Sequence, residues 1–218
     1  MSEHEMDPIA IATQTIEAFV EAVGSDAPTP GGGAASAVEA AIGCALVSMV
    51  ANLTVGKKGF EDIGDRMREM ATEAVAARAD FLRLADADAH AFDGVMLAFK
   101  MPKETDADKT ARSVAIQAGY EEAAQVPLEI ARRSVDLMRL AEDATAAGNP
   151  QAASDGLSAA TSLYASALCA IANVEINAAA LKDPALRGPM LDEAASLRSR
   201  ADGSLKGSQT AFQLRLSS

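Results

Sequence analysis

Residues 28–58 read PTPGGGAASAVEAAIGCALVSMVANLTVGKK, and this stretch decides the fold. It begins with a rigid proline turn and three glycines, Gly31 to Gly33, and continues as a long run of small and apolar residues with one charge, Glu39. Glycines can take positive φ and let another group approach the backbone closely. The run predicts a helix, whose free N–H groups and positive dipole end would bind an anion beside the glycines. The alternative is a plain turn that leads into a tightly packed helix.

The composition favours one all-α domain over residues 1–218. A chain of 218 residues is long enough to bury a full core. Aromatic residues make up 4% of the chain, tryptophan is absent and alanine is abundant, which favours helices packed closely on small side chains. No run of alternating β-branched residues predicts a strand.

Charge and residue types exclude several classes of protein. The net charge of −12 argues against a nucleic-acid partner, because phosphate binding needs a basic face. His4 and His90 are the only histidines, and there is no CxxC or HExxH motif, so we predict no metal site. Cys44 and Cys169 lie in apolar helical runs and are predicted to be buried thiols in a reducing compartment.

Two segments of the sequence bear on where the protein is located in the cell. The N-terminal segment MSEHEMDPIA is acidic, with no basic region before an apolar core, so we expect no signal peptide and a cytoplasmic protein. The run Gly33 to Gly56 is long enough to raise the question of a membrane span. Because this run contains Glu39 and is rich in glycine, alanine and serine, we interpret it as the central helix of a soluble bundle, with no membrane partner.

Start and stop signals divide the chain into about six to seven helices, which predicts an antiparallel bundle. The expected ranges are Pro8 to Gly24, Gly33 to Val55, Glu61 to Lys100, Thr105 to Tyr120 or Pro127, Leu128 to Ala147, Ala153 to Lys182 and Met190 to Leu214. The first helix is expected to have Asp7 as its N-cap, and Pro127 is expected to kink the fourth or to begin a new segment.

The central helix is apolar most of the way round. One side carries its large residues, and alanines lie nearby, so we expect burial on several sides. The large residues are Val38, Ile42, Leu46, Met49 and Leu53.

Asp88 is the most informative position of the third helix. An apolar stripe recurs there at three- and four-residue spacing and includes Leu84 and Phe92, and Asp88 takes the position between them. Burial disfavours the charged form of a carboxylate and raises its pKa, which suits general acid–base catalysis near neutral pH. The alternative is a structural pair with a lysine or arginine. Asp86, on another face, is interpreted as solvated.

Other polar residues have weaker patterns. Lys103, with Lys100, could supply positive charge near a helix end, although lysines there are also ordinary caps. Asn173 and Asn177 lie one turn apart on the sixth helix, where they could line a cleft or hydrogen-bond across a helix contact. Asp155 follows a helix start, and no ligand role follows from its pattern alone.

Five motifs in order carry a resemblance that spans about residues 9–214. They are PTPGGG before a small-residue helix, NLTVGKK, DADAHAF, MPKET, and GN with SD six residues on. Together they resemble the cyclodeaminase/cyclohydrolase family, which includes the C-terminal half of formiminotransferase-cyclodeaminase and stand-alone methenyltetrahydrofolate cyclohydrolases. The resemblance implies an all-helical homodimer that binds a tetrahydrofolate derivative near the subunit interface and needs no metal or redox cofactor.

The resemblance also implies roles for particular residues. Asp88 matches the second aspartate of the family's DxDAxAF motif, the proposed catalytic carboxylate, and Lys103 matches the lysine expected to orient water or stabilise the intermediate. The remaining matches and cleft candidates are expected to bind substrate: Pro30, Gly31, Gly32, Gly33, Lys57, Lys58, Asp86, Asp155, Asn173 and Asn177. Met101 departs mildly from the family loop, and the role of Glu39 is open.

The expected activity is hydrolysis of 5,10-methenyltetrahydrofolate to 10-formyltetrahydrofolate, because no formiminotransferase half precedes the domain. The first alternative is formimidoyltetrahydrofolate cyclodeaminase, whose reaction makes the same acid–base demands as the cyclohydrolase reaction. The second alternative is a non-catalytic helical module, either a folate carrier or a scaffold.

Overall fold

The computed structural model describes residues 10–217, and these residues form helices with no strand among them. The α-helices are α1 (Ile16–Val23), α2 (Gly32–Asn52), α3 (Gly64–Phe99), α4 (Asp106–Ala147), α5 (Ala153–Ala179) and α6 (Pro184–Leu216). One short 3-10 turn, η1 (Ile11–Thr13), precedes α1, and two others, η2 (Glu61–Ile63) and η3 (Pro150–Ala152), precede α3 and α5. The predicted all-α class and antiparallel bundle are confirmed.

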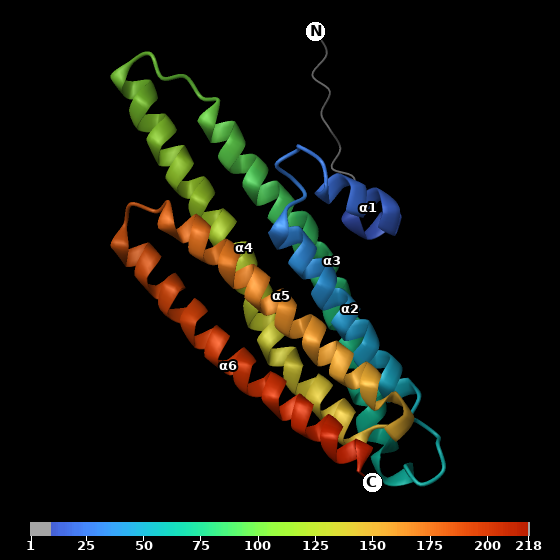
Figure 1. The fold of residues 1–218 in the computed structure, drawn as a ribbon. Helices are drawn as coiled ribbons and strands as arrows, with labels where there is room; N and C mark the ends of the chain where they lie inside the picture. Colours follow the sequence, from blue (N-terminus) through green and yellow to red (C-terminus); the bar gives the residue numbers. More distant parts are fainter. Residues whose placement is uncertain (1–9, 218) are drawn as a thin grey trace.

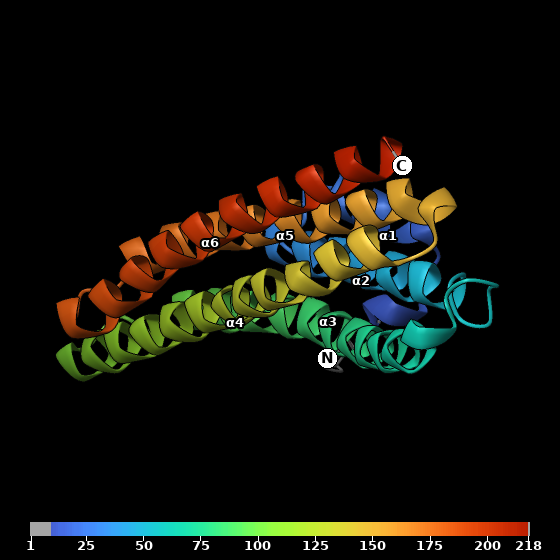
Figure 2. The ribbon, with the colours of Figure 1, turned by 90° about the horizontal axis from the view of Figure 1, so that it is seen from below.

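Five long helices form the bundle, and α1 lies apart at its side (Figure 1). Helices α2, α3, α4 and α5 pack as a ring, in which α2 contacts α3 and α5, and α4 contacts the same two helices. Helix α6 covers α4 and α5 from outside (Figure 2). The α3–α4 and α5–α6 connections lie at one end of the bundle, and the loop after α2 lies at the other.

Small side chains let α2 pack closely against its neighbours. A Cβ at Gly43 would lie 2.9 Å from the Leu163 side chain of α5 and 3.1 Å from the Ala159 carbonyl oxygen. Alanines, serines and Cys44 fill most of the buried side, together with Val47 and Val50.

The predicted burial of α2 on several sides is confirmed, because it contacts α3, α4 and α5. Of its large residues, Val38 and Leu46 pack partly buried against the core, whereas Ile42 and Met49 are 54% and 45% exposed. Small residues lie at the closest helix contacts, such as that at Gly43, because a larger side chain would not fit there.

Two of the long helices pass a length and composition test for crossing a membrane. They are α2 and the stretch from Pro150 to Ala179. Of the most apolar 18 residues of each, 61% and 44% are buried inside the bundle. Core helices of soluble proteins pass the same test, so this finding does not indicate a membrane.

Several boundaries differ from the expectations. Helix α1 begins at Ile16, with the Thr15 side chain accepting a hydrogen bond from the Ala18 N–H, and the predicted Asp7 cap lies outside the described residues. Helix α4 continues through Pro127 without interruption. Cys44 is buried as predicted, whereas Cys169 is exposed, because it lies on the outward side of α5.

Candidate functional site

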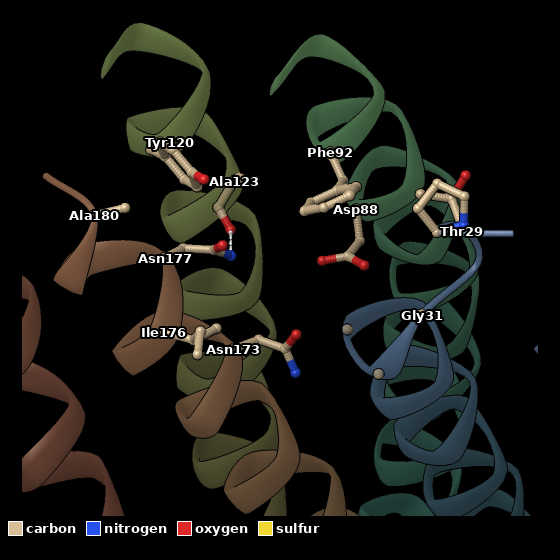
Figure 3. Close-up of a pocket in the computed structure, with 13 residues that line it drawn as sticks. Thr29, Gly31, Asp88, Phe92, Tyr120, Ala123, Asn173, Ile176, Asn177 and Ala180 are labelled. Atoms are coloured by element: carbon tan, nitrogen blue, oxygen red, sulfur yellow. Dashed lines mark hydrogen bonds between the residues drawn. The ribbon is translucent and has the colours of Figure 1, made fainter. Parts of the chain in front are cut away.

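A cavity of about 310 Å³ lies where the start of α2 meets the second half of α3, the first half of α4 and the C-terminal end of α5 (Figure 3). Its wall combines the glycine turn, one carboxylate, two amides and two aromatic rings. The lining residues are Pro28, Thr29, Gly31, Gly32, Gly33, Asp88, Phe92, Tyr120, Ala123, Asn173, Ile176, Asn177 and Ala180. Its size falls within the range of small-molecule sites.

Asp88 points from α3 into this cavity. Its carboxylate accepts a hydrogen bond from the Ala34 N–H, in the first turn of α2. The α2 N-cap residue, Gly31, has no side chain to cap the helix, so Asp88 supplies a cap from another element. A Cβ at Gly33 would overlap this carboxylate, so glycine is needed there for the close approach.

Burial raises the pKa of Asp88 from 3.8 to about 6, and the Ala34 hydrogen bond opposes part of that shift. Burial dominates because the carboxylate loses most of its water and, within residues 10–217, no ion pair joins it to a cation. The alternative role for Asp88, a structural ion pair with a lysine or arginine, is therefore not found among the described residues. At neutral pH the group is mostly ionised and still readily protonated.

The raised pKa predicts a pH-dependent cost to stability. The folded state binds the Asp88 proton more tightly than the unfolded state, so stability falls as pH rises from about 4 through 6. We expect the free energy of unfolding of Asp88→Asn, relative to that of the wild type, to increase by about 2 to 3 kcal/mol between pH 4 and pH 7. Urea unfolding at several pH values measures this difference. A difference that stays constant with pH would contradict the raised pKa.

Two amides on α5 present their oxygens to the cavity. The Asn177 Nδ2 donates to the Ala123 carbonyl oxygen at 2.7 Å, and the Asn173 Nδ2 donates to the Cys169 carbonyl oxygen at 2.8 Å. Because a carbonyl only accepts, each amide must turn its N–H group toward that partner and keep its own oxygen available. The wall is therefore rich in acceptors.

Pro127 explains why the Ala123 carbonyl is available. In a helix, the N–H of residue 127 would donate to the carbonyl of residue 123, and proline has no N–H. The freed carbonyl oxygen accepts from Asn177 instead. The proline predicted to interrupt α4 thus contributes to the orientation of a site amide.

The other two aspartates of the motif region hold neighbouring segments in place. Asp86 Oδ1 accepts from the Ile11 N–H at 2.7 Å, and Asp93 Oδ1 accepts from the Thr29 hydroxyl at 3.3 Å. Asp86 does not line the cavity, so the structure does not place it where the predicted contact with substrate would occur. The Asp93 contact fixes the turn before the glycines against α3.

The predicted basic residues lie away from the cavity. Lys57 and Lys58 follow α2 at the far end of the bundle, where Lys57 Nζ donates to the Asn149 side chain at 2.6 Å. Asp155 begins α5 at that same end. Lys103 is exposed in the α3–α4 loop, beyond the end of α3 at Phe99, which is about 16 Å along the helix from Asp88.

Four further observations complete the comparison with the predicted site. Pro30 does not line the cavity, and its peptide bond with Thr29 is cis.

Sequence reasoning missed Tyr120 and Ile176, which had no pattern of their own, and left Phe92 in the core stripe. Phe92 could have been found, because it lies four residues after Asp88 and shares its helix face. Glu39 lies outside this cavity, half-buried, and burial raises its pKa.

No group of three or more His, Cys, Asp or Glu side chains that could hold a metal ion occurs within residues 10–217. The cavity itself offers a single carboxylate with amides, which is a poor ligand set for a metal.

Comparisons with known proteins place the chain in a family. The model of the family described as Formiminotransferase-cyclodeaminase matches residues 15–196. The chain belongs to this family. It is 39% identical over 188 residues to a methenyltetrahydrofolate cyclohydrolase from Methylorubrum extorquens, covering 86% of this chain and 90% of that protein.

Two further relatives of the family extend the comparison. The formimidoyltransferase-cyclodeaminase of Sus scrofa is 36% identical over 85% of this chain, which spans only 34% of that longer protein. The crystal structure of a formiminotetrahydrofolate cyclodeaminase from Thermotoga maritima has a TM-score of 0.84 and 32% identity, covering 93% of this chain and 98% of that one. The resemblance inferred from the motifs is confirmed, and so is the fold.

Proposed function

We propose that the protein is a methenyltetrahydrofolate cyclohydrolase, which hydrolyses 5,10-methenyltetrahydrofolate to 10-formyltetrahydrofolate in the cytoplasm. The observation that carries the proposal is the Asp88 carboxylate, held at the start of α2 and directed into the cavity with its pKa near 6. The cyclohydrolase relative supports the choice of reaction, because it matches this chain over most of both lengths.

The acceptor-rich wall suits this substrate. A reduced pterin ring carries several N–H groups on one edge, and the oxygens of Asn173 and Asn177 can accept from them. The methenyl bridge between N5 and N10 is cationic, so an ionised Asp88 beside it is favourable. Phe92 and Tyr120 supply apolar walls for the rings.

In the proposed mechanism, Asp88 moves one proton in each direction. It takes a proton from water as the water oxygen bonds to the bridging carbon, which gives a neutral tetrahedral carbinol. The protonated Asp88 then donates to N5 as the bond between carbon and N5 breaks. The carbinol hydroxyl loses its proton as the formyl group forms on N10, so the reaction releases one proton overall. No cofactor takes part in these steps.

Lys103 enters this mechanism only if its loop moves. Its predicted role was to orient water or stabilise the intermediate, and its exposed position in the α3–α4 loop does not support that role in this conformation. We therefore assign the proton transfers to Asp88, with Asn173 and Asn177 as binding groups.

Formimidoyltetrahydrofolate cyclodeaminase is the second candidate. The longer Sus scrofa relative and the structural relative bear names of this activity, and the same cavity could accept N10 as nucleophile and ammonia as leaving group. A non-catalytic folate carrier or scaffold is the third.

A paired assay on one preparation separates the candidates. Loss of methenyltetrahydrofolate absorbance, corrected for spontaneous hydrolysis, is measured beside ammonia release from formiminotetrahydrofolate. We expect acceleration of the first reaction only. Acceleration of the second would make the protein a cyclodeaminase, and silence in both would favour a binding module.

We propose that the protein is a homodimer. Large apolar residues are exposed on α2, including Ile42 and Met49, and on α1, including Ile16, which is 85% exposed. Exposed apolar surface of this kind is typical of protein interfaces. We expect light scattering to give twice the chain mass, and Ile42→Glu to give the monomer mass. A monomeric wild type at micromolar concentration would contradict the proposal.

A further inference from the structure

A line of side-chain contacts runs from the cavity toward the α3–α4 loop. Tyr120, at the edge of the cavity, meets the Phe99 ring edge-to-face at a centroid distance of 6.3 Å. The Arg112 guanidinium lies 5.4 Å from the centroid of that same Phe99 ring, and it donates to the Phe99 carbonyl oxygen. The aromatic wall of the cavity therefore leads to a fixed cation.

A second line of contacts reaches the same region from α5. Gln117 Nε2 donates to the carbonyl oxygen of Ala180, which lines the cavity, and Gln117 Oε1 accepts from the Lys182 N–H at 2.7 Å. The Lys182 Nζ donates to the Ser113 hydroxyl, next to Arg112 in sequence, at 3.2 Å. Both cations are thus held beside the α4 face that continues from Tyr120.

Arg112 differs from most arginines of the described bundle in having no carboxylate partner, and Lys182, like most lysines there, has none either. Eight arginines within residues 10–217 form ion pairs, and neither Arg112 nor Lys182 is among the paired cations: the paired arginines are Arg66, Arg68, Arg83, Arg132, Arg133, Arg139, Arg198 and Arg200. In a chain of net charge −12, two positioned and unpaired cations beside a cavity favour an anionic ligand.

We propose that Arg112 and Lys182 bind the carboxylates of the substrate's glutamate tail. This inference rests on the proposed function. The cavity of about 310 Å³ accommodates the pterin ring and leaves the rest of the ligand to continue outward. Tyr120 and Arg112 are eight residues apart, about 12 Å along α4. A benzoyl ring with its amide and glutamate spans roughly 10 Å by ordinary bond lengths.

The geometry also assigns the middle of the tail. The benzoyl ring would lie along Tyr120 and Phe99, of which Phe99 is 43% exposed. The two carboxylates would then reach the guanidinium and the ammonium, which are the charged donors that match them. This replaces the lysines that the sequence suggested for the same task, since Lys57 and Lys58 lie at the other end of the bundle.

The test compares two substrates in the full-length protein. Methenyltetrahydrofolate carries the glutamate, and methenyltetrahydropteroate lacks it. We expect Arg112→Gln and Lys182→Gln each to raise KM for the folate by about fivefold, the size expected of a partly exposed charged contact. KM for the pteroate and kcat for both should stay near the wild-type values. Arg112→Lys should restore part of the loss.

The control is Lys206→Gln, which removes one positive charge from an exposed position on α6. It should leave both KM values unchanged. Equal KM values for wild type and variants with the folate would overturn the inference, and so would an equal rise with both substrates. If the wild type hydrolyses neither substrate, the proposed function fails and this inference fails with it. Hydrolysis of the pteroate by the wild type keeps the two failures distinct.

Discussion

Replacing Asp88 with asparagine is expected to lower kcat for hydrolysis of methenyltetrahydrofolate by about a thousandfold, the middle of the range for a general acid–base group. Asparagine can still accept from the Ala34 N–H, so the start of α2 stays capped. It can neither take a proton from water nor give one to N5. Substrate binding should change little, because the cavity keeps its shape. Stopped-flow loss of methenyl absorbance measures the rate.

Asp86→Asn is the matched control for this variant. It removes the same group two residues away on the same helix, from a side chain that accepts from the Ile11 N–H and does not line the cavity. Its kcat should stay within about threefold of the wild type, the change expected of a group outside the chemistry. A kcat for Asp88→Asn near that of Asp86→Asn would remove Asp88 from the mechanism.

Gly33→Ala is expected to have the second large effect. The new Cβ would overlap the Asp88 carboxylate, which lies against the glycine backbone. The carboxylate must then rotate away, lose the Ala34 hydrogen bond and leave its position in the cavity. A displacement of about 1 Å at a reacting group can cost a hundredfold in rate, and we expect kcat/KM to fall by about that factor.

The neighbouring glycines supply a graded control. A Cβ at Gly31 would lie 3.6 Å from the Pro28 carbonyl oxygen, which is an ordinary contact, and one at Gly32 would lie 3.3 Å from Asn173 Nδ2. We expect Gly31→Ala to retain activity and Gly32→Ala to lose a modest part of it. Circular dichroism and unfolding curves show whether each variant is folded. Equal activity at all three positions would contradict a special role for Gly33.

The fold and the burial of the Asp88 carboxylate at the cavity were predictable because they depend on local patterns. Helix boundaries follow from proline, glycine and capping residues, as at Thr105, whose capping box with Asp108 starts α4. Asp88 interrupts an apolar stripe, so its helix periodicity alone directs it toward the interior. The glycine turn was likewise recognised, and the structure shows why it is needed: Asp88 approaches it too closely for a side chain at Gly33.

The rest of the site depends on how distant segments meet. Lys57 lies beside a glycine-rich helix in sequence, yet α2 carries it through 21 helical residues to the other end of the bundle. Tyr120 has no distinguishing pattern, and it reaches the cavity only because α4 packs between α3 and α5. The exposure of Ile42 and Met49 on α2 was not predicted, for a related reason. Hydrophobicity indicates which residues can be buried, whereas close helix packing selects the small ones.

The pH dependence of kcat/KM tests the central claim most directly, because it reports the pKa of the acid–base group in the free enzyme. The account predicts that kcat/KM for methenyltetrahydrofolate, corrected for spontaneous hydrolysis, rises about tenfold per pH unit at low pH. The rise should level off above about pH 6, the pKa of Asp88. This limb should be absent from the residual activity of Asp88→Asn. A flat wild-type profile, or the same limb in the variant, would contradict the assignment of Asp88 as the catalytic carboxylate.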